Sequence, residues 1–358
     1  MSKYYLYLLC AFGALFVGCA KKQQIAQEES PNFEKLMGKE LPAWQHVKTK
    51  EDFENLHFFK TLFEQNIPLL KAEYKKYKIP QVIHFIWVGP KPFPRESVEN
   101  IKSWIIHNPD WKVKFWTDRE RPLPHPAMEQ RLIKDFTFLK LAQCYHKSDN
   151  YGEKSDLLRL EILYQEGGIY ADHDVKCLHS FDTCSEAYDL FCGLEMPYQT
   201  SLPSSVLPTN NLLGAKAGHP VLLHAMDWLV EKWDQIERDY PGKDRDAVIN
   251  RVSHRTFSIL GETLKKIGNQ EGNKDMVFPA FYFNSPDENN AIMARHQYAG
   301  TWFENESQFE KMVRERLMML SKKTNKMLLF FGILTSLNVL GFILLFFRMS
   351  RLNKSNVL

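Results

Sequence analysis

Residues 153–175, "EKSDLLRLEILYQEGGIYADHDV", place a helix and a strand on either side of two glycines. Apolar residues recur at helical spacing up to Leu163, and Gly167 is the kind of residue that ends a helix. Residues 168–172, "GIYAD", then combine branched and aromatic side chains as a buried strand does. A helix folded directly onto the strand that follows it is typical of α/β layered domains.

The rest of the chain repeats this alternation. The predicted strands are 79–89, 111–118 and 187–195, and the predicted helices are 97–109 and 219–240. Residues 51–78 also show helical spacing, interrupted at Pro68, and they follow a polar stretch at 21–40 that we expect to be a linker. We therefore predict an α/β domain over residues 79–307, preceded by a linker and helical lead-in over 21–78.

Residues 327–347, "MLLFFGILTSLNVLGFILLFF", contain no charged side chain and are long enough to span a bilayer as a helix. Lysines and arginines flank both ends, so the charge pattern leaves the orientation open. The sequence predicts a basic juxtamembrane helix at 308–326, a transmembrane helix at 327–347 and a basic tail at 348–358.

Residues 1–20 carry a second apolar segment after Lys3, which predicts a signal sequence or a signal anchor. The segment ends "LFVGCAKK", and a small residue before a cysteine is typical of a bacterial lipoprotein cleavage site. Cys19 is therefore a candidate for lipidation, and an uncleaved anchor is the alternative. Either interpretation places the protein at a membrane, and leaves a Golgi-like lumen and a bacterial membrane both open.

The formal net charge is +3, from 46 lysines and arginines against 43 aspartates and glutamates. The basic excess lies from Glu310 onward, where the sequence has nine basic residues and two acidic ones, so the rest of the chain is mildly acidic. This distribution argues against a nucleic-acid-binding surface.

Four cysteines lie beyond the leader: Cys144, Cys177, Cys184 and Cys192. They show no C-x-x-C spacing, which argues against a zinc site. One or two disulfides would suit an exported domain, and free buried thiols are the alternative.

Asp172 and Asp174 lie one residue apart at the end of the predicted strand. Side chains two apart on a strand point to the same side, so we expect both carboxylates to face together, with His173 turned away. Ligands of open α/β sheets bind at the carboxyl ends of strands, and two oxygen ligands there suit Mg²⁺ or Mn²⁺. Such a metal would neutralise a diphosphate leaving group. A pair of solvated aspartates at a strand end is the alternative.

Asp156 and Arg159 lie three residues apart on the predicted helix, and therefore on one face of it. Because the two glycines fold this helix onto the aspartate strand, we expect the pair over the same crevice. Arg159 would contact a phosphate in a forked geometry, and Asp156 would accept a hydrogen bond from a sugar hydroxyl. An ion pair on the helix surface is the alternative.

The segments "IPQVIHFIWVG", "NPDWKVKFWTD", "SDLLRLEILYQEGGIYADHDV" and "ARHQYAGTW" follow one another in that order. Together they resemble the glycosyltransferase family with a DXD sugar-binding region (family 32), which includes yeast Golgi α-mannosyltransferases and inositol-phosphorylceramide mannosyltransferases. A more distant similarity is to the glucosylating clostridial toxins. The similarity runs from about Ile79 to Trp302, and the S-D-x-x-R…G-G-x-Y-x-D-x-D block is its specific part.

The resemblance implies a GT-A-like fold, a UDP- or GDP-hexose donor, a divalent metal and transfer with retention of configuration. By motif position, Asp172 and Asp174 would be catalytic, binding the metal and the donor diphosphate. Asp156 and Arg159 would hold the donor sugar and its phosphate end.

Further residues become candidates through the same resemblance. Trp87 would stack on the nucleotide base, and a plain core residue is the alternative. His296 and Trp302 resemble the family's late His…Trp element, which closes over the diphosphate; a surface histidine and a packed tryptophan are the alternative. Asn210 or Asn211, in the loop before "GAKAGHP", is a candidate for lining the acceptor side of the binding site.

The chain departs from the family pattern in two places. Ala171 and His173 replace the larger apolar residues that are common beside the two aspartates. The segment "HRTFSILGETL" stands where many members carry T-G-P, so the acceptor contacts cannot be carried over.

We therefore predict a membrane-tethered, metal-dependent glycosyltransferase that moves a hexose from a nucleotide sugar to a glycan, lipid or protein acceptor. One alternative is a catalytically silent sugar-nucleotide-binding membrane protein. Another is a phosphatase-type hydrolase with Asp172 as nucleophile. That class usually has Thr or Val two residues after its second aspartate, where this chain has Lys176, and it gives the S-D-x-x-R helix no role.

Overall fold

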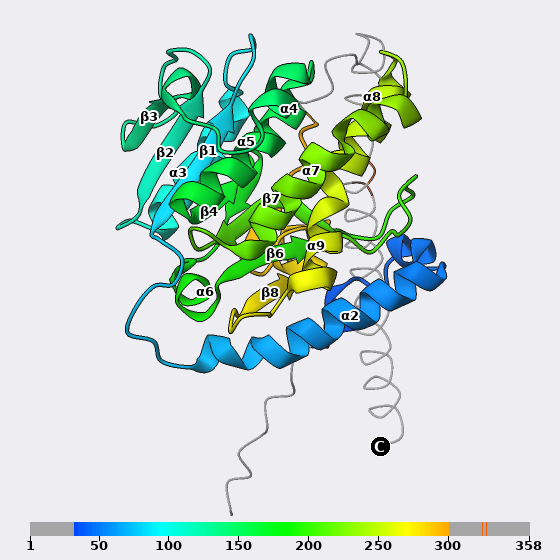
Figure 1. Ribbon diagram of the computed structural model, residues 1–358. Coiled ribbons are helices and arrows are strands. Elements are labelled where there is room, and N and C mark those ends of the chain that lie inside the picture. Colours follow the sequence, from blue (N-terminus) through cyan, green and yellow to red (C-terminus); the bar gives the residue numbers. More distant parts are fainter. Residues whose placement is uncertain (1–31, 301–323, 325–326, 328–358) are drawn as a thin grey trace, which may run out of the picture.

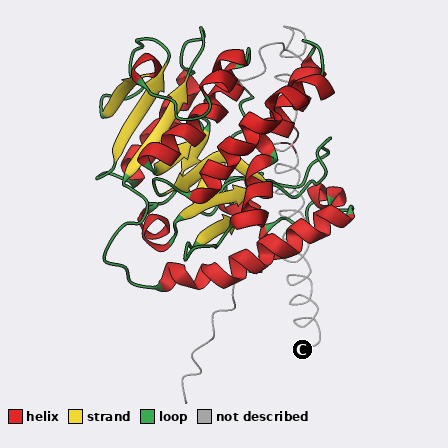
Figure 2. Cartoon of the chain, viewed as in Figure 1, coloured by secondary structure: helices red, strands yellow, loops and turns green. Residues whose placement is uncertain are grey.

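Strands and helices alternate along the chain (Figure 2), as the sequence predicts for an α/β fold. The structure, a computed structural model, describes residues 32–300 together with Thr324 and Met327 (Figure 1). The strands are β1 (Val82–Trp87), β2 (Lys112–Thr117), β3 (Met128–Leu132), β4 (Gly168–Ala171), β5 (Val175–Cys177), β6 (Leu190–Leu194), β7 (Pro208–Ala215), β8 (Asp275–Phe278) and β9 (Ala294–His296). The α-helices are α1 (Phe33–Leu36), α2 (Lys50–Asn66), α3 (Val98–His107), α4 (Ala142–Lys147), α5 (Tyr151–Glu166), α6 (Asp182–Ala187), α7 (Pro220–Asp239), α8 (Arg245–Val252) and α9 (Ile259–Ile267).

Several predictions fall outside the described residues. These are the leader 1–20 with Cys19, the juxtamembrane helix 308–326 apart from Thr324, the span 327–347 apart from Met327, the tail 348–358, and Trp302. Within the part of the chain that is described, no helix is long and apolar enough to cross a bilayer.

A mixed sheet with the strand order β3-β2-β1-β4-β7-β6-β8 organises the described residues. β1 pairs in parallel with β2 and β4, and β6 pairs in parallel with β8. β7 runs antiparallel to its two neighbours, β4 and β6. The carboxyl ends of β1, β4 and β6 therefore meet at one edge of the sheet, which is where ligands bind in open α/β sheets.

The two-glycine turn between α5 and β4 is required by its surroundings. Gly167 follows α5 with φ 67°, and Gly168 begins β4 with φ 103°. A Cβ at Gly168 would lie 2.5 Å from the Val82 carbonyl oxygen and 2.9 Å from His84 Nε2. Glycine at both positions therefore lets α5 return directly onto the sheet.

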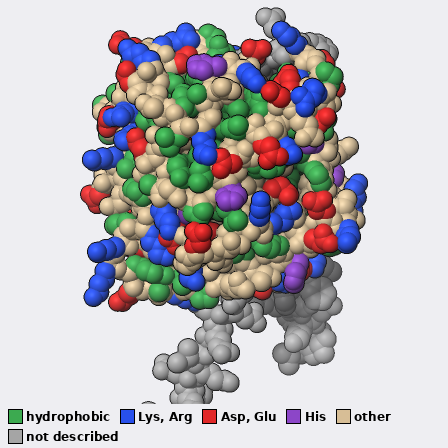
Figure 3. Space-filling model, viewed as in Figure 1, with side chains coloured by type: hydrophobic (Ala, Val, Ile, Leu, Met, Phe, Trp, Pro, Cys, Tyr) green, Lys and Arg blue, Asp and Glu red, His purple; other side chains and the backbone are tan. Residues whose placement is uncertain are grey.

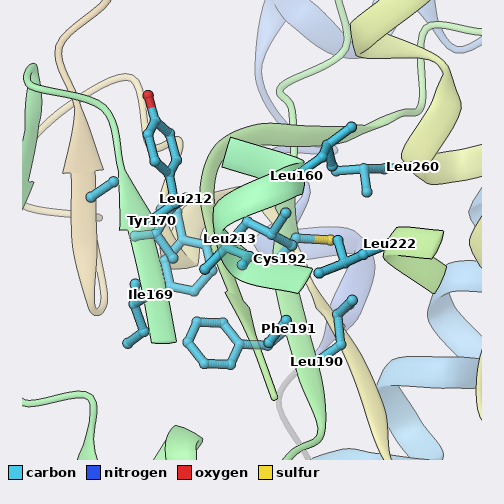
Figure 4. Close-up of a cluster of buried hydrophobic side chains, with 14 of the residues drawn as sticks. Leu160, Ile169, Tyr170, Leu190, Phe191, Cys192, Leu212, Leu213, Leu222 and Leu260 are labelled. Atoms are coloured by element: carbon cyan, nitrogen blue, oxygen red, sulfur yellow. The ribbon is translucent and has the colours of Figure 1, made fainter. Parts of the chain in front are cut away.

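Helix α7 packs on α5 and on α9, and α5 and α9 pack against the sheet (Figure 1). Figure 4 shows this contact, where Leu160 of α5, Leu222 of α7 and Leu260 of α9 gather around the strand residues Cys192 and Leu213. None of these five side chains is more than 3% exposed. The helical layer and the sheet thus share one core, and the core fixes α5 relative to the strand ends.

The predicted polar linker ends earlier than expected. Phe33 and Met37 are buried in the same core as the sheet, and the Ala280 N–H donates to Met37 Sδ at 3.3 Å. Helix α2 packs against the edge strand β8 and buries Phe59 and Phe63. The linker prediction is therefore wrong from Phe33 onward, because a four-residue helix is too short to show a period in the sequence.

The four cysteines beyond the leader, Cys144, Cys177, Cys184 and Cys192, are all buried free thiols, which decides between the two alternatives that the sequence left open. On the face of the molecule in Figure 3, basic and acidic side chains are interspersed rather than gathered by sign.

Candidate functional site

A cleft of about 740 Å³ lies at the carboxyl edge of the sheet. Trp87 ends β1, Asp172 follows β4 and Glu195 follows β6, and all three line the cleft. Helices α5 and α8 contribute further lining residues. The volume is in the range of sites that bind small molecules and cofactors.

The two aspartates converge through a turn rather than through strand alternation. β4 ends at Ala171, and the Val175 N–H donates to the Asp172 carbonyl oxygen at 3.0 Å, which closes the turn. The expected reason for their proximity was therefore wrong, although the two carboxylates do come together. His173 also lines the cleft: its ring centroid lies 5.0 Å from that of Trp87, and its Nδ1 lies 2.7 Å from Ser97 Oγ.

A third side chain reaches the aspartates from a distant part of the chain. Strand β9 pairs with β5, just after the aspartates, and this pairing brings His296 to the carboxylates. One ligand atom from each of Asp172, Asp174 and His296 lies within 4.8 Å of the other two. Two carboxylates and an imidazole at this separation can hold a divalent metal. We refer to these three residues as the metal cluster; the sequence prediction did not count His296 among the metal ligands.

Hydrogen bonds and charge already fix part of the metal cluster. Asp174 Oδ2 accepts the Ala299 N–H at 2.7 Å and lies 3.4 Å from His296 Nε2. Burial favours the neutral form of Asp174, but His296 and the Ala299 N–H hold its pKa well below the ordinary value. Burial also opposes a charge on His296, yet the neighbouring Asp174 and Asp172 raise its pKa from 6.5 to about 8. A metal that binds the imidazole would displace any proton on the ligating nitrogen.

Arg159 is only 3% exposed, and its guanidinium is surrounded by oxygens of the protein. Nη2 lies 2.7 Å from Asp156 Oδ1 and 3.2 Å from Asp172 Oδ1, and it donates to the Tyr170 hydroxyl at 3.0 Å. Nη1 donates to the Asn210 carbonyl oxygen. The Tyr170 hydroxyl, which points out of the apolar cluster in Figure 4, donates in turn to Asp172. The guanidinium thus orients the first aspartate of the metal cluster, and the expected contact of Arg159 with a phosphate stays a prediction.

Asp156 is 6% exposed, so the alternative of an ion pair on the helix surface is wrong. Thr256 Oγ1 donates to Asp156 Oδ2 at 2.5 Å. Burial raises the pKa of Asp156 from 3.8 to about 6, against the lowering effects of Arg159 and Thr256. Asp156 lines the cleft, so it can accept a hydrogen bond from a sugar hydroxyl when ionised and donate one to it when protonated.

Trp87 is both a packed residue and a lining residue of the cleft. It is 9% exposed, its Nε1 donates to the Lys91 carbonyl oxygen at 2.9 Å, and its ring meets Phe93 edge-on at 5.5 Å. The ring of Tyr151, at the start of α5, packs against Gly89: a Cβ at Gly89 would lie 2.6 Å from the ring. Trp87 and Tyr151 together give the cleft aromatic surface on which a nucleotide base can stack.

Asn211 lies within β7 and not in a loop, which corrects that part of the prediction. Its Nδ2 lies 2.8 Å from His296 Nδ1 and 2.6 Å from Asn284 Oδ1, and Thr209 donates to its Oδ1 at 2.7 Å. Asn211 therefore positions the imidazole of the metal cluster. Trp302 stays a prediction, because it lies outside the described residues.

Sequence reasoning did not anticipate Tyr170 and Glu195, which line the cleft, or Thr256, which contacts Asp156. Thr256 lies on a π-helical turn, Ser253–Phe257, and nothing in the sequence links it to Asp156. Glu195 did carry a signal, because it closes a predicted strand much as Asp172 does.

Comparison with known proteins identifies the region that carries the aspartates. Residues 94–191 match the family described as "Glycosyltransferase sugar-binding region containing DXD motif". The chain is similar to this family over that region. This region includes Asp156, Arg159, Asp172 and Asp174, whereas His296 lies beyond it.

Two curated relatives are similar to part of the chain. "Subversion of eukaryotic traffic protein A" from Legionella pneumophila subsp. pneumophila is 28% identical over 197 residues, which is 50% of this chain and 28% of that protein. "Inositol phosphoceramide mannosyltransferase 3" from Schizosaccharomyces pombe is 31% identical over 150 residues, 41% of this chain and 36% of that protein. The chain thus spans well under two thirds of the length of either relative. Among solved structures, "PaToxG Glycosyltransferase" has 16% identity and a TM-score of 0.41, over 61% of this chain and 79% of that chain. The matched region and the Schizosaccharomyces pombe relative are similarities to glycosyltransferases over part of the chain.

Proposed function

We propose that the chain is a metal-dependent glycosyltransferase that transfers a hexose from a nucleotide sugar to an acceptor hydroxyl. The observation that carries the proposal is the meeting of the metal cluster with Asp156 and Arg159 in one cleft. All of these residues except His296 belong to the matched family region. A mixed sheet with its site at the carboxyl ends of parallel strands supports a GT-A type of fold.

The cleft offers a separate contact to each part of a nucleotide sugar. Trp87 and Tyr151 supply aromatic surface for the base. The metal cluster lies where the diphosphate would follow, and Asp156 is placed to bind hydroxyls of the hexose. Arg159 holds Asp172 and Asp156 in position, so its contribution is to the geometry of both neighbours.

The metal cluster fits a divalent cation, because its carboxylate oxygens are hard ligands, its imidazole is a borderline ligand, and one ligand atom from each residue lies within 4.8 Å of the other two. An imidazole beside two carboxylates suits Mn²⁺ better than Mg²⁺, which prefers an all-oxygen shell. A cation held there supplies the positive charge that stabilises a departing diphosphate. The hydrogen bond from the Ala299 N–H keeps the buried Asp174 carboxylate aligned for this role.

We also propose transfer with retention of configuration, by attack of the acceptor hydroxyl on the face from which the diphosphate leaves. The relative named for mannosyl transfer to an inositol phosphoceramide supports mannose as one candidate for the transferred hexose and a lipid as one candidate acceptor. The predicted leader and membrane span support an enzyme tethered to a membrane, with glycan and protein acceptors there as the other candidates.

Donor hydrolysis by the full-length chain in a mild detergent tests the proposal. UDP-glucose, UDP-galactose, UDP-N-acetylglucosamine and GDP-mannose are incubated with and without Mn²⁺, and released nucleoside diphosphate is measured. We expect release from one donor only with Mn²⁺, and loss of that release in Asp174→Asn. Asp227→Asn is the matched control, because its carboxylate lies on α7 and pairs with the surface Lys140.

Two results would contradict the proposal. Metal-dependent binding of a nucleoside diphosphate, without release from any donor, would favour the catalytically silent protein instead. Release that proceeds equally well in Asp174→Asn would remove the metal cluster from the reaction.

A further inference from the structure

Glu195 is a carboxylate of the cleft that has no part in the donor contacts described above. It follows β6 directly, as Asp172 follows β4, and β7 is the one strand between them in the sheet. Neighbouring strands are about 4.8 Å apart, so the two residues leave the sheet roughly 10 Å from each other along the same edge. Glu195 is thus placed beside the metal cluster, on the side away from β1 and Trp87.

The carboxylate of Glu195 is fixed through only one of its two oxygens, Oε1. Oε1 accepts the Tyr298 hydroxyl and, at 3.0 Å, the Met196 N–H, while the Glu195 N–H donates to the Leu207 carbonyl oxygen at 2.9 Å. Within residues 32–300, no hydrogen bond or ion pair reaches Oε2. A carboxylate that is fixed through one oxygen and open through the other is arranged to receive a hydrogen bond from a ligand.

The lining beyond Glu195 differs from the lining around Trp87. Tyr198 and Leu207 from the β6–β7 connection line the cleft together with Ile249 and Phe257 from α8 and the turn after it. Ser201 Oγ donates to Asn250 Oδ1 at 2.7 Å, which ties the β6–β7 connection to α8. Among the described residues that line this part of the cleft beyond Glu195, none is a lysine, arginine, histidine, aspartate, glutamate or cysteine, and this lining suits the second substrate better than a diphosphate with its metal.

We propose that Glu195 binds the attacking hydroxyl of the acceptor through Oε2 and takes up its proton during transfer. This inference rests on the proposed glycosyltransferase function. The acceptor oxygen forms a bond to the anomeric carbon, and the bond from that carbon to the diphosphate oxygen breaks with its electron pair on the diphosphate. The hydroxyl proton passes to Glu195, which later releases it to water, and Tyr298 keeps the carboxylate aligned.

Donor hydrolysis tests the inference with water as the acceptor. Glu195→Gln, Tyr298→Phe and the control Glu262→Gln, an exposed carboxylate on α9 paired with Lys265, are compared with the unmodified full-length chain. For each variant, kcat and KM for the hydrolysed UDP- or GDP-hexose are measured with Mn²⁺. Binding of the matching nucleoside diphosphate with Mn²⁺ is measured by calorimetry, and this readout also shows that the variant is folded.

We expect Glu195→Gln to lower kcat by about 100-fold or more, because removal of a positioned proton acceptor has effects of that size. KM for the donor and the affinity for the nucleoside diphosphate should stay near those of the unmodified chain. Tyr298→Phe should lower kcat by a smaller factor, and Glu262→Gln should change neither parameter.

Three results would overturn the inference. An unchanged kcat in Glu195→Gln would exclude Glu195 from the transfer step, and a parallel loss of nucleoside diphosphate binding would assign it to the donor instead. A hexose covalently attached to Glu195, found by mass spectrometry of the quenched protein, would make it a nucleophile. Failure of the unmodified chain to bind or hydrolyse any donor is a different outcome, because it refutes the proposed function on which the inference rests.

Discussion

Removal of the Arg159 guanidinium should destabilise the protein more than any other single loss of charge at the site. Arg159→Met keeps most of the aliphatic volume and deletes the contacts to Asp156, Asp172, Tyr170 and Asn210. Asp156 is then left 6% exposed, with the hydroxyl of Thr256 as its remaining contact. A buried carboxylate that loses its cation is a large source of instability.

The structure limits how large this effect can be. Burial raises the pKa of Asp156 from 3.8 to about 6 even with Arg159 present. At pH 7 that shift already corresponds to about 3 kcal/mol, and complete neutralisation of the carboxyl would correspond to only about 4 kcal/mol. Because Asp156 can take up a proton, loss of its counter-charge accounts for only about 1 kcal/mol. The lost hydrogen bonds to Tyr170 and Asn210 contribute about 1 kcal/mol each, so we expect Arg159→Met to cost about 3 kcal/mol in all.

Thermal unfolding followed by tryptophan fluorescence measures the effect. For a domain of this size, about 3 kcal/mol corresponds to a fall in Tm of roughly 6–12 °C at pH 7. The deficit should shrink as the pH falls toward 5.5, because protonation of Asp156 in the variant becomes less costly. Arg131→Met is the control: that guanidinium lies on β3, is 44% exposed and pairs with Glu129, and such surface pairs contribute little.

A double variant separates the buried charge from the other contacts of Arg159. Asp156→Asn combined with Arg159→Met removes both charges, so its Tm should lie above that of Arg159→Met alone. A double variant that is no more stable than the single one would refute the reasoning, because the uncompensated carboxylate would then not be the source of the loss. A fall in Tm no larger than that of Arg131→Met would refute it as well.

Two further predictions concern the frame of the site. Gly168→Ala should lower stability by more than about 3 kcal/mol, because its Cβ would lie 2.5 Å from the Val82 carbonyl oxygen at φ 103°. Gly218→Ala, at φ 69° with nothing within 4 Å of its Cβ, carries only the backbone strain; equal falls in Tm would contradict the contact argument. His84 is fully buried, and burial lowers its pKa from 6.5 to about 4, so the folded protein resists a proton that the unfolded chain accepts. Between pH 6.5 and pH 4, the free energy of unfolding of the unmodified chain should therefore fall by about 3 kcal/mol more than that of His84→Gln. Identical dependence of the two unfolding free energies on pH would contradict this.

Local sequence patterns predict the elements around the aspartates because short-range geometry determines them. The glycines at 167 and 168 end α5 and begin β4 where the pattern indicates, and Trp87 ends a strand as expected. The order of strands in the sheet is a different matter. β7 lies between β4 and β6 in the sheet although it comes later in the chain than both, and no local pattern encodes that strand order. For the same reason Asn211 was expected in a loop and lies in a strand.

The site could be predicted in its chemistry but only in part in its geometry. Asp156 and Arg159 were expected over the crevice, yet their burial depends on α5 being enclosed along its length from Asp156 to Leu163. The contact of Thr256 with Asp156 joins residues about a hundred positions apart and leaves no trace in either segment. A contact of this kind forms only once the helices have packed, so sequence periodicity cannot report it.

The two aspartates of the metal cluster differ in what holds them, and this difference divides the site. Asp172 is held by Arg159 and Tyr170, which lie close to it in the chain and inside the matched family region. Asp174 is held by His296 and Ala299, which reach it only through the pairing of β9 with β5. The part of the site around Asp172 is therefore built by local structure, whereas the part around Asp174 is completed by a segment that the family match does not cover. It follows that the assembly of the metal cluster depends on the β5–β9 pairing, even though both aspartates precede it in the sequence.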